Sequence, residues 1–577
     1  MGSALPVRPA TKARREERVM ESKILKRICA LNYFLNRFQF SRRRFAKDED
    51  GAVLVFSLVL FVLMVMIGGL AVDLMRYETT RTTLQNTLDR STLAAASLSQ
   101  KLDPESVVRD YFAKAGLSEY LTTVNVNEGL NFREVKANAL ADTKPLFLHM
   151  IGINELEAPA RSTAEQRIDN LEISLVLDIS GSMSGTKLAN LKLAAKDFVD
   201  TVLSSDPEHR IAISIVPYNA QVNLGSVLRA KYTVLYDNGV ATSNCIEIPA
   251  GYYSTPGIST SVGIPLMAHA DIANSTTTGT TAVSPTNSNA IPNYGSVQCK
   301  TTAQNIVRLP SQNIATLKTQ IDGLQAAGNT SIMTGMKWGL ALLDPGARPM
   351  FASLLAQGAM TGELEGRPFD YDDPEAIKVI VLMTDGEHVS HTYVTDNFKA
   401  GASPIYKSTG DGNYSVFHPA RSGNQYWTPH LSTWRAAAWN SGSGVVQQDW
   451  KQIWSNLRAS YVAWHFYARA TGTSNSTRNT IYNAKMNEIR TTFASVATMD
   501  AQLQQSCALS KANDIVVYGI AFDAPANGQQ QIKSCTTGYD SADPNGTNAY
   551  YFASTPDNIK DAFETIATNI SQLRLTQ

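Results

Sequence analysis

The longest apolar run of the chain extends from Ala52 to Val72 and contains no charged residue. A helix needs about 20 apolar residues to cross a bilayer, so this run predicts a membrane-spanning helix. Polar residues enter at Asp73, and the apolar positions among them recur at helical spacing. These positions are Leu74, Tyr77, Leu84, Leu88 and Ala95. We expect the helix to continue as an amphipathic stalk packed on its own domain, with binding of a partner helix as the alternative.

Shorter patterns follow in residues 104–170. Residues 108–117 (VRDYFAKAGL) have helical periodicity, whereas residues 122–129 and 132–142 have the pattern of strands. This region therefore predicts a small α/β unit.

From Leu171 onward, short apolar runs alternate with helical patterns. Nearly continuous apolar runs are typical of buried parallel strands, and they occupy residues 171–178, 210–218, 376–386, 514–523 and 549–554. Helical periodicity is found at residues 187–203, 313–324, 334–343 and 556–573. Strands that alternate with helices predict an α/β fold with a doubly wound, mostly parallel sheet.

Two long stretches interrupt this alternation. Residues 219–310 are rich in Ser, Thr, Asn, Gly and Pro, and residues 388–512 contain six of the seven tryptophans. Both are too long for simple loops of a compact domain. We interpret them as insertions with their own partial structure, and we expect the tryptophans to form a small core because large aromatic side chains are usually buried.

The charge distribution predicts the orientation of the membrane helix. Lys plus Arg and Asp plus Glu both total 51, so the chain has no bulk attraction for nucleic acid. Residues 1–50, however, contain thirteen Lys and Arg against six Asp and Glu. The positive-inside rule places this segment in the cytoplasm and the chain after Asp73 outside it. A cleaved signal peptide is the alternative, although the apolar run is longer than a usual signal core.

The five cysteines fit this topology. Cys29 lies on the predicted cytoplasmic side, and the other four lie where disulfides persist. Four cysteines allow three pairings. We favour Cys245 with Cys299 and Cys507 with Cys535, because each pair closes a local loop.

Polar residues gather where the predicted strands end. Asp178, Ser180 and Ser182 follow the first strand, Thr330 precedes a helix, and Asp385 follows the strand IKVIVLMT. Ligands of open α/β sheets bind outside the carboxyl ends of the strands. The sequence therefore predicts that these five side chains form one site.

This set resembles the metal-ion-dependent adhesion site of the von Willebrand factor A family. The pattern Asp-x-Ser-x-Ser is complete at residues 178–182, Thr330 lies five positions before Gly335, and the second aspartate lies in the sequence TDGE. The resemblance covers residues 171–573 without the two insertions. It implies that one divalent cation, expected to be Mg²⁺, binds a protein partner that presents a carboxylate.

The chemistry of the five residues agrees with this implication. Mg²⁺ prefers six oxygen ligands in a tight octahedron and retains some of its waters. Serine and threonine hydroxyls are neutral ligands, so the ion keeps positive charge that a partner carboxylate could meet. The alternative is that these residues only cap helices. Glu387, His388 and His391 follow the site, and we expect them to be exposed loop residues and not ligands.

Rival chemistries fit less well. A nucleotide loop requires Lys followed by Ser or Thr after its second glycine, whereas here Thr186 precedes Lys187 and Leu188 follows it. No Gly-x-Ser-x-Gly pentapeptide follows a strand, as a serine hydrolase of the elbow type requires. We therefore predict a binding protein and not an enzyme, with a magnesium-dependent enzyme as a remaining alternative.

The N-terminal segment is similar to TadG-like proteins of the tight-adherence (Flp) pilus system. In that family an apolar helix is followed by motifs that correspond here to Asp73-Leu74, Arg81, Leu84-Gln85, Asp89 and Leu93-Ala94-Ala95. The segment around Cys507, DIVVYGIAF and YYFAS also resembles the family. Related pseudopilins are cleaved after a glycine and carry Glu five residues later; Gly51 matches, but Phe56 occupies the Glu position.

These observations predict a bacterial inner-membrane protein with a periplasmic A-type domain that acts in Flp pilus assembly or adhesion, together with other pilus-assembly proteins. A free-standing adhesion or sensing module without a pilus link is the alternative. The expected parts are a cytoplasmic segment (1–50), a membrane helix (51–73), a TadG-like stalk and small unit (74–170) and an A-type domain (171–577) with insertions at 219–310 and 388–512.

Overall fold

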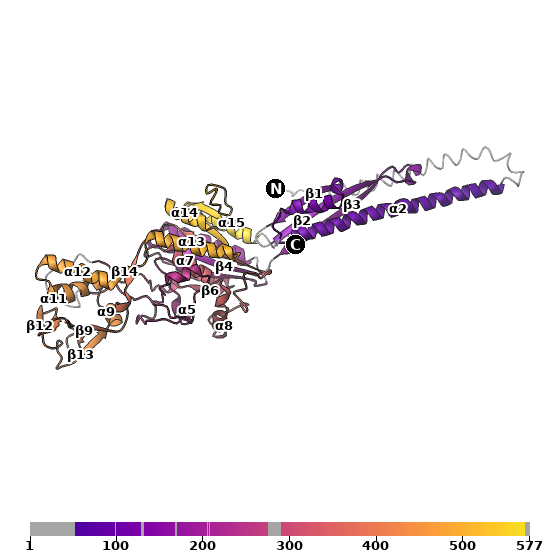
Figure 1. Cartoon of the computed structure of the whole chain (residues 1–577). Coiled ribbons are helices and arrows are strands. Elements are labelled where there is room, and N and C mark those ends of the chain that lie inside the picture. Colours follow the sequence, from indigo (N-terminus) through magenta and orange to yellow (C-terminus); the bar gives the residue numbers. More distant parts are fainter. Residues whose placement is uncertain are drawn as a thin grey trace, which may run out of the picture. The chain divides into compact units, whose positions relative to one another are not determined.

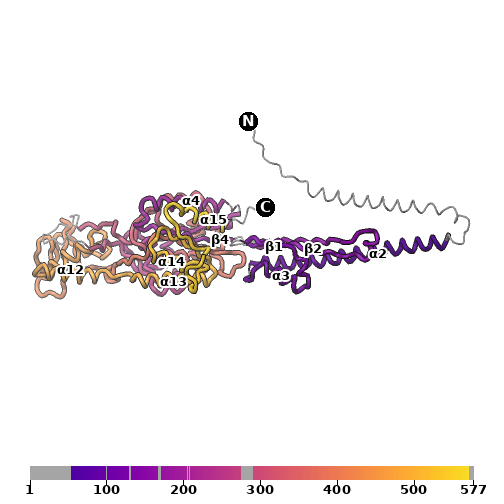
Figure 2. The backbone as a smooth tube through the Cα atoms, turned by 90° about the horizontal axis from the view of Figure 1, so that it is seen from above, coloured from indigo at the N-terminus to yellow at the C-terminus, as the bar shows by residue number. Residues whose placement is uncertain are grey.

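The computed structural model describes residues 52–571, apart from residues 99, 129–131, 168, 169, 205, 207 and 275–289. The predictions for residues 1–50, including Cys29, lie outside the described residues. The chain divides into two compact units (Figures 1 and 2). The first comprises Met1–Val126 and Glu134–Glu165, and the second comprises Asn127–Arg133 and Gln166–Gln577.

The first unit contains one long helix, one short helix and a small sheet. Its elements are α2 (Ala52–Ala96), α3 (Pro104–Lys114), β1 (Leu121–Glu128), β2 (Phe132–Thr143) and β3 (Leu156–Arg167). The three strands pair in the order β1-β2-β3, and β2 and β3 run alongside α2 (Figure 1). The predicted apolar run and stalk form the single continuous helix α2. Strand β3 was not predicted, because its sequence LEAPARSTAEQR has few large apolar residues.

The later positions of the apolar stripe of the stalk face the core of this unit, whereas Leu74 is 56% exposed. Leu84, Leu88 and Ala95 are fully buried on α2, and they pack in one cluster with Phe112 of α3 and with alanines of β2 and β3. The stripe of α2 therefore packs on its own domain, as expected for most amphipathic helices.

The second unit is built on a six-stranded sheet in the order β16-β15-β7-β4-β5-β6. The strands are β4 (Asn170–Asp178), β5 (Ile211–Tyr218), β6 (Arg308–Ser311), β7 (Ala376–Thr384), β15 (Val516–Phe522) and β16 (Tyr551–Ser554). All neighbours are parallel except β6, which is antiparallel to β5. The predicted mixed α/β class with a mostly parallel sheet is confirmed. Strand β6 was not predicted, because it has four residues and includes Pro310.

Helices cover both faces of this sheet. One face packs against α4 (Thr186–Ser204), α6 (Ile314–Gly323) and α15 (Ile559–Ser571), and Figure 2 shows α4 beside α15. The other packs against α7 (Ile332–Ala341), α8 (Arg348–Ala356), α13 (Val496–Ala512) and α14 (Ala526–Cys535). Alternate residues of β4 point to opposite faces, since Leu175 and Val176 belong to different clusters.

Residues 388–512 contain a second sheet and a set of helices. Five strands pair in the order β12-β11-β10-β9-β13, with bounds β9 (Ala402–Ser408), β10 (Tyr414–Phe417), β11 (Tyr426–Thr428), β12 (Thr433–Arg435) and β13 (Val445–Asp449). The helices are α9 (Trp450–Asn456), α10 (Ala459–Tyr461), a π-helix (Val462–Ala468), α11 (Arg469–Thr471) and α12 (Asn475–Ile489). Strands β8 (Thr392–Val394) and β14 (Arg490–Thr492) pair with each other. Trp450, Trp454 and Trp464 belong to one buried cluster, so three of the six tryptophans lie in a small core as predicted, whereas Trp434 and Trp439 are half-buried.

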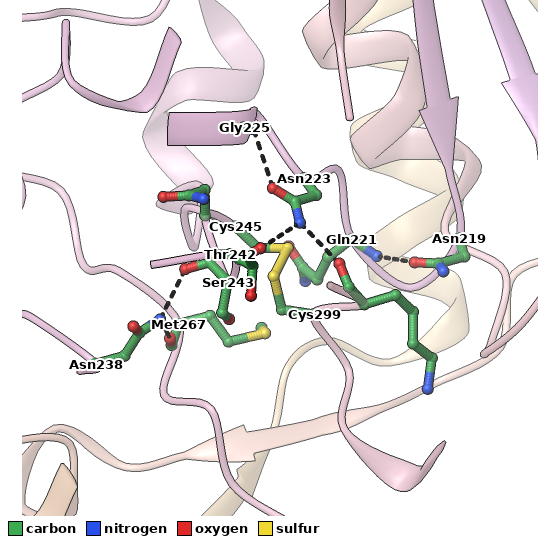
Figure 3. Close-up of a disulfide and its surroundings, with 12 residues drawn as sticks. Asn219, Gln221, Asn223, Gly225, Asn238, Thr242, Ser243, Cys245, Met267 and Cys299 are labelled. Atoms are coloured by element: carbon green, nitrogen blue, oxygen red, sulfur yellow. Dashed lines mark hydrogen bonds between the residues drawn. A yellow bond between two sulfur atoms is a disulfide. The ribbon is translucent and has the colours of Figure 1, made fainter. Parts of the chain in front are cut away.

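Both predicted disulfides are present. Cys507 and Cys535 link α13 to the end of α14. Cys245 and Cys299 link two parts of residues 219–310, a region that contains the short helix α5 (Gly225–Arg229). Figure 3 shows this second bridge beside Asn223, whose amide donates to the carbonyls of Thr242 (2.9 Å) and Lys300 (2.7 Å).

Candidate metal centre

The two aspartates of the candidate site end neighbouring parallel strands. Strand β4 ends at Asp178, and Asp385 follows the last residue of β7. The turn after β4 brings its serines to the same place: the Ser182 hydroxyl donates to Asp385 Oδ1 (2.7 Å) and lies 3.0 Å from the Ser180 hydroxyl. The sheet therefore assembles four of the predicted residues directly.

Asp178 lies at the base of this group and is completely buried. Its Oδ1 accepts from the backbone N–H of Ser180 (2.8 Å), and its Oδ2 accepts from the Thr384 hydroxyl (2.7 Å). The hydroxyl of Tyr218, at the end of β5, lies 3.5 Å from the same Oδ2. Burial, followed by the nearby carboxylate of Asp385, raises the pKa of Asp178 to about 6. A cation at this position would oppose both effects, because it favours the ionised carboxylate.

Thr330 is brought to the site by its loop. The carbonyl of Gly328 accepts from Gly181 N–H (2.8 Å), and the N–H of Ser331 donates to the carbonyl of Asn219 (2.9 Å). A Cβ atom added to Gly386 would lie 3.3 Å from the Thr330 hydroxyl and 3.8 Å from the Ser182 hydroxyl. Both hydroxyls therefore face the space above Gly386, where a side chain would crowd them.

These oxygens have the spacing of ligands on one small cation. In an octahedron with Mg–O distances of 2.0–2.1 Å, neighbouring oxygens are about 2.9 Å apart. The Ser180–Ser182 and Ser182–Asp385 separations are 3.0 and 2.7 Å. The residues thus fit a hard cation that prefers oxygen. Among the described residues, no group of three or more His, Cys, Asp or Glu is placed to hold a metal, so any ion here would depend largely on hydroxyls.

Lys187 also lies at the site, although the sequence pattern did not predict it there. Lys187 Nζ lies 3.1 Å from Asp385 Oδ2 and 3.1 Å from Asp523 Oδ2. Asp523 directly follows β15. Because ligands bind outside the carboxyl ends of parallel strands, the reasoning that selected Asp178 and Asp385 could also have selected Asp523. Tyr218 and Thr384 likewise lie at the ends of strands. We assign them the role of positioning the Asp178 carboxylate, and not that of ligands.

The expectation that His388 and His391 are exposed loop residues is wrong. Both are about 3% exposed. His388 Nε2 accepts from the N–H of Met333 (2.9 Å), and its Nδ1 contacts Asp500 (2.7 Å). His391 stacks on Phe493 with ring centroids 4.9 Å apart. Both nitrogens of His388 are therefore occupied, and it positions the start of α7 and not a metal.

Comparison with known proteins adds information on the N-terminal segment. Residues 51–98 match the family model described as "Putative Flp pilus-assembly TadE/G-like". This segment is therefore similar to that family. The match includes α2, and it confirms the resemblance inferred for this part of the chain. A search of curated proteins gave no match.

Several of the similar solved structures are pilus proteins. The vWF domain of the type V pili tip protein Mfa5 from Porphyromonas gingivalis has 14% identity and a TM-score of 0.27, over 71% of this chain and 98% of that one. The adhesive tip pilin GBS104 from Group B Streptococcus agalactiae has 11% identity and a TM-score of 0.29, over 70% and 100%. The PilB minor pilin from Streptococcus sanguinis has 12% identity and a TM-score of 0.28, over 79% and 78%.

Proposed function

We propose that this chain is a membrane-anchored, metal-dependent protein-binding module that acts in Flp pilus assembly or adhesion. The observation that carries the proposal is the contact of the Ser182 hydroxyl with both the Ser180 hydroxyl and Asp385, at the ends of β4 and β7. The TadE/G-like segment at residues 51–98 supports the pilus role.

In this proposal, Ser180, Ser182 and Thr330 offer hydroxyl oxygens to Mg²⁺ or another divalent cation. Asp178 and Asp385 bind it directly or through water. An ion held mainly by neutral hydroxyls would keep net positive charge and would have a coordination position open to a further ligand. The carboxylate of a protein partner suits that position. Lys187 adds positive charge beside Asp385, so the electrostatics of the site favour an acidic partner group.

The anchor in this proposal is α2. Among the described residues, Val53–Ala96 is the helix that is long and apolar enough to cross a membrane. Its N-terminal part presents exposed apolar side chains, such as Phe56 (68%) and Phe61 (64%). With the basic residues 1–50 in the cytoplasm, the second unit would be periplasmic in a bacterial inner membrane. Two disulfides in that unit agree with an oxidising compartment.

A binding role accounts for the site better than catalysis. A metal hydrolase needs a base near the ion, and His388 is the histidine three residues after Asp385. Its two ring nitrogens are engaged by Met333 and Asp500, so it is not free to accept a proton from a substrate.

The alternative function is a free-standing adhesion or sensing module with the same metal site. It differs in lacking any link to a pilus. A gene neighbourhood without pilus-assembly genes would favour it, whereas their presence would favour the proposal.

The direct test is complementation of a deletion strain with the full chain. We expect Ser182→Ala to abolish piliation and Ser184→Ala to preserve it. Ser184 is the matched control, because it is an exposed serine two residues away in the same turn. Equal piliation by both variants, at equal protein levels, would refute the metal-dependent role.

A further inference from the structure

The connection between β2 and β3 has an unusually apolar tip. We define the tip as residues 145–153, whose sequence is PLFLHMIGI between Lys144 and Asn154. Three of its apolar side chains are exposed, whereas Leu148 is buried: Leu146 is 55% exposed, Met150 70% and Ile151 46%. Exposing three large apolar side chains of one short turn to water costs free energy. We therefore expect a nonpolar neighbour to cover this surface.

The tip lies against the apolar part of α2. The Phe147 ring packs on Gly69, where an added Cβ would clash with the ring. An apolar groove continues from this contact along α2 to Phe61, with Met150 and Ile151 on its other side. From Leu70 to Phe61 the helix rises about 14 Å, which is close to half of the hydrocarbon thickness of a bilayer.

Most N–H groups of the tip backbone are hydrogen-bonded within the protein. Asp73 accepts from the N–H groups of Leu146 (2.7 Å), Phe147 (2.7 Å) and Leu148 (2.8 Å). The N–H groups of Met150, Gly152 and Ile153 donate to carbonyls within the tip, and Pro145 has no N–H to satisfy. An unsatisfied backbone group is costly in the hydrocarbon region, and these bonds satisfy six N–H groups of the tip.

We propose that the tip is inserted into the lipid bilayer beside α2, with acyl chains covering Leu146, Met150 and Ile151. The inference rests on the proposed membrane anchor, since the tip shares the depth of the α2 residues that it contacts. Asp73 is the key residue of the arrangement. It ends the charge-free run and at the same time holds the tip against the helix. The first unit would then enter the membrane at two points.

The test uses the full chain in phosphatidylcholine–phosphatidylglycerol vesicles with nitroxide spin labels. All variants carry Cys29→Ser, and the other four cysteines are paired in buried disulfides. Labels at Met150→Cys, Leu58→Cys and Lys114→Cys report the tip, the anchor and the exposed surface of α3. Collision with oxygen, which concentrates in lipid, is compared with collision with a water-soluble nickel chelate.

We expect the labels at positions 150 and 58 to be accessible to oxygen and shielded from nickel, and the label at position 114 to show the reverse. Adding Asp73→Ala should raise the nickel accessibility of position 150 and leave position 58 unchanged. A nickel-accessible label at 150 with a lipid-exposed label at 58 would overturn the tip proposal alone. Nickel access at both positions would overturn the anchor itself. A label at 150 shielded from both reagents would show that protein covers the tip, and would also overturn the proposal.

Discussion

Replacing Thr384 by valine tests how Asp178 is held in the candidate site. Valine has nearly the same shape as threonine, so the change removes a hydroxyl without leaving a cavity. Thr384 donates to Asp178 Oδ2 at 2.7 Å, and both residues are completely buried. A hydrogen bond to a charged group contributes about 1.5–3 kcal/mol. We expect the metal-free protein to lose that much unfolding free energy near neutral pH.

The same substitution should weaken metal binding. Residues that orient a ligand typically contribute roughly 10–100-fold to metal affinity, and we expect a loss of Mg²⁺ affinity in this range. Urea unfolding is followed by tryptophan fluorescence, which reports the second unit because all seven tryptophans lie in it. The matched control is Ser174→Ala, since the buried Ser174 hydroxyl has no hydrogen-bond partner in the described part of the chain. If Thr384→Val matched wild type in both stability and affinity, Thr384 would not be what positions Asp178.

Three further predictions concern other parts of the second unit. Replacing Cys507 and Cys535 by alanine opens a loop with a sequence separation of 28, and should cost about 3–4 kcal/mol in denaturant unfolding; a loss below 1 kcal/mol would contradict this. Burial lowers the pKa of His391 from 6.5 to about 4, so the unfolded chain binds more protons between these values and stability falls as the pH drops. We expect a loss of about 2 kcal/mol at pH 5 relative to pH 7.5, which His391→Gln should remove; an unchanged pH slope in this variant would disprove it. Lys187→Met removes a cation 3.1 Å from Asp385. Because a partly exposed ion pair contributes little free energy, we expect Mg²⁺ binding to tighten by roughly fivefold. Equal or weaker Mg²⁺ binding of the variant by calorimetry would contradict this prediction.

The sequence allowed the main sheet to be predicted because its central strands are buried on both faces. Five of the nine residues of β4 and seven of the nine residues of β7 are apolar, and this pattern depends only on local residues. The edge strand β6 and the alanine-rich β3 lack such a signal. They form strands because a neighbour is available for pairing, which is information from distant parts of the chain.

The proximity of the two candidate aspartates could be predicted for a similar reason. Asp178 and Asp385 follow buried strands, and parallel strands place their ends at one edge. The contacts of His388 could not be predicted, because its partner Asp500 lies 112 residues later on α13. Burial of a loop residue depends on which helix packs over it, and no local pattern encodes that choice.

Titration of the full chain with Mg²⁺ by isothermal calorimetry tests the central claim most directly. The account predicts that wild type and Ser184→Ala bind a single ion per chain, and that Ser182→Ala and Asp385→Asn lose this binding while remaining folded. The absence of Mg²⁺ binding by the folded wild type, or equal binding by Ser182→Ala, would contradict the assignment of a metal site to the ends of β4 and β7.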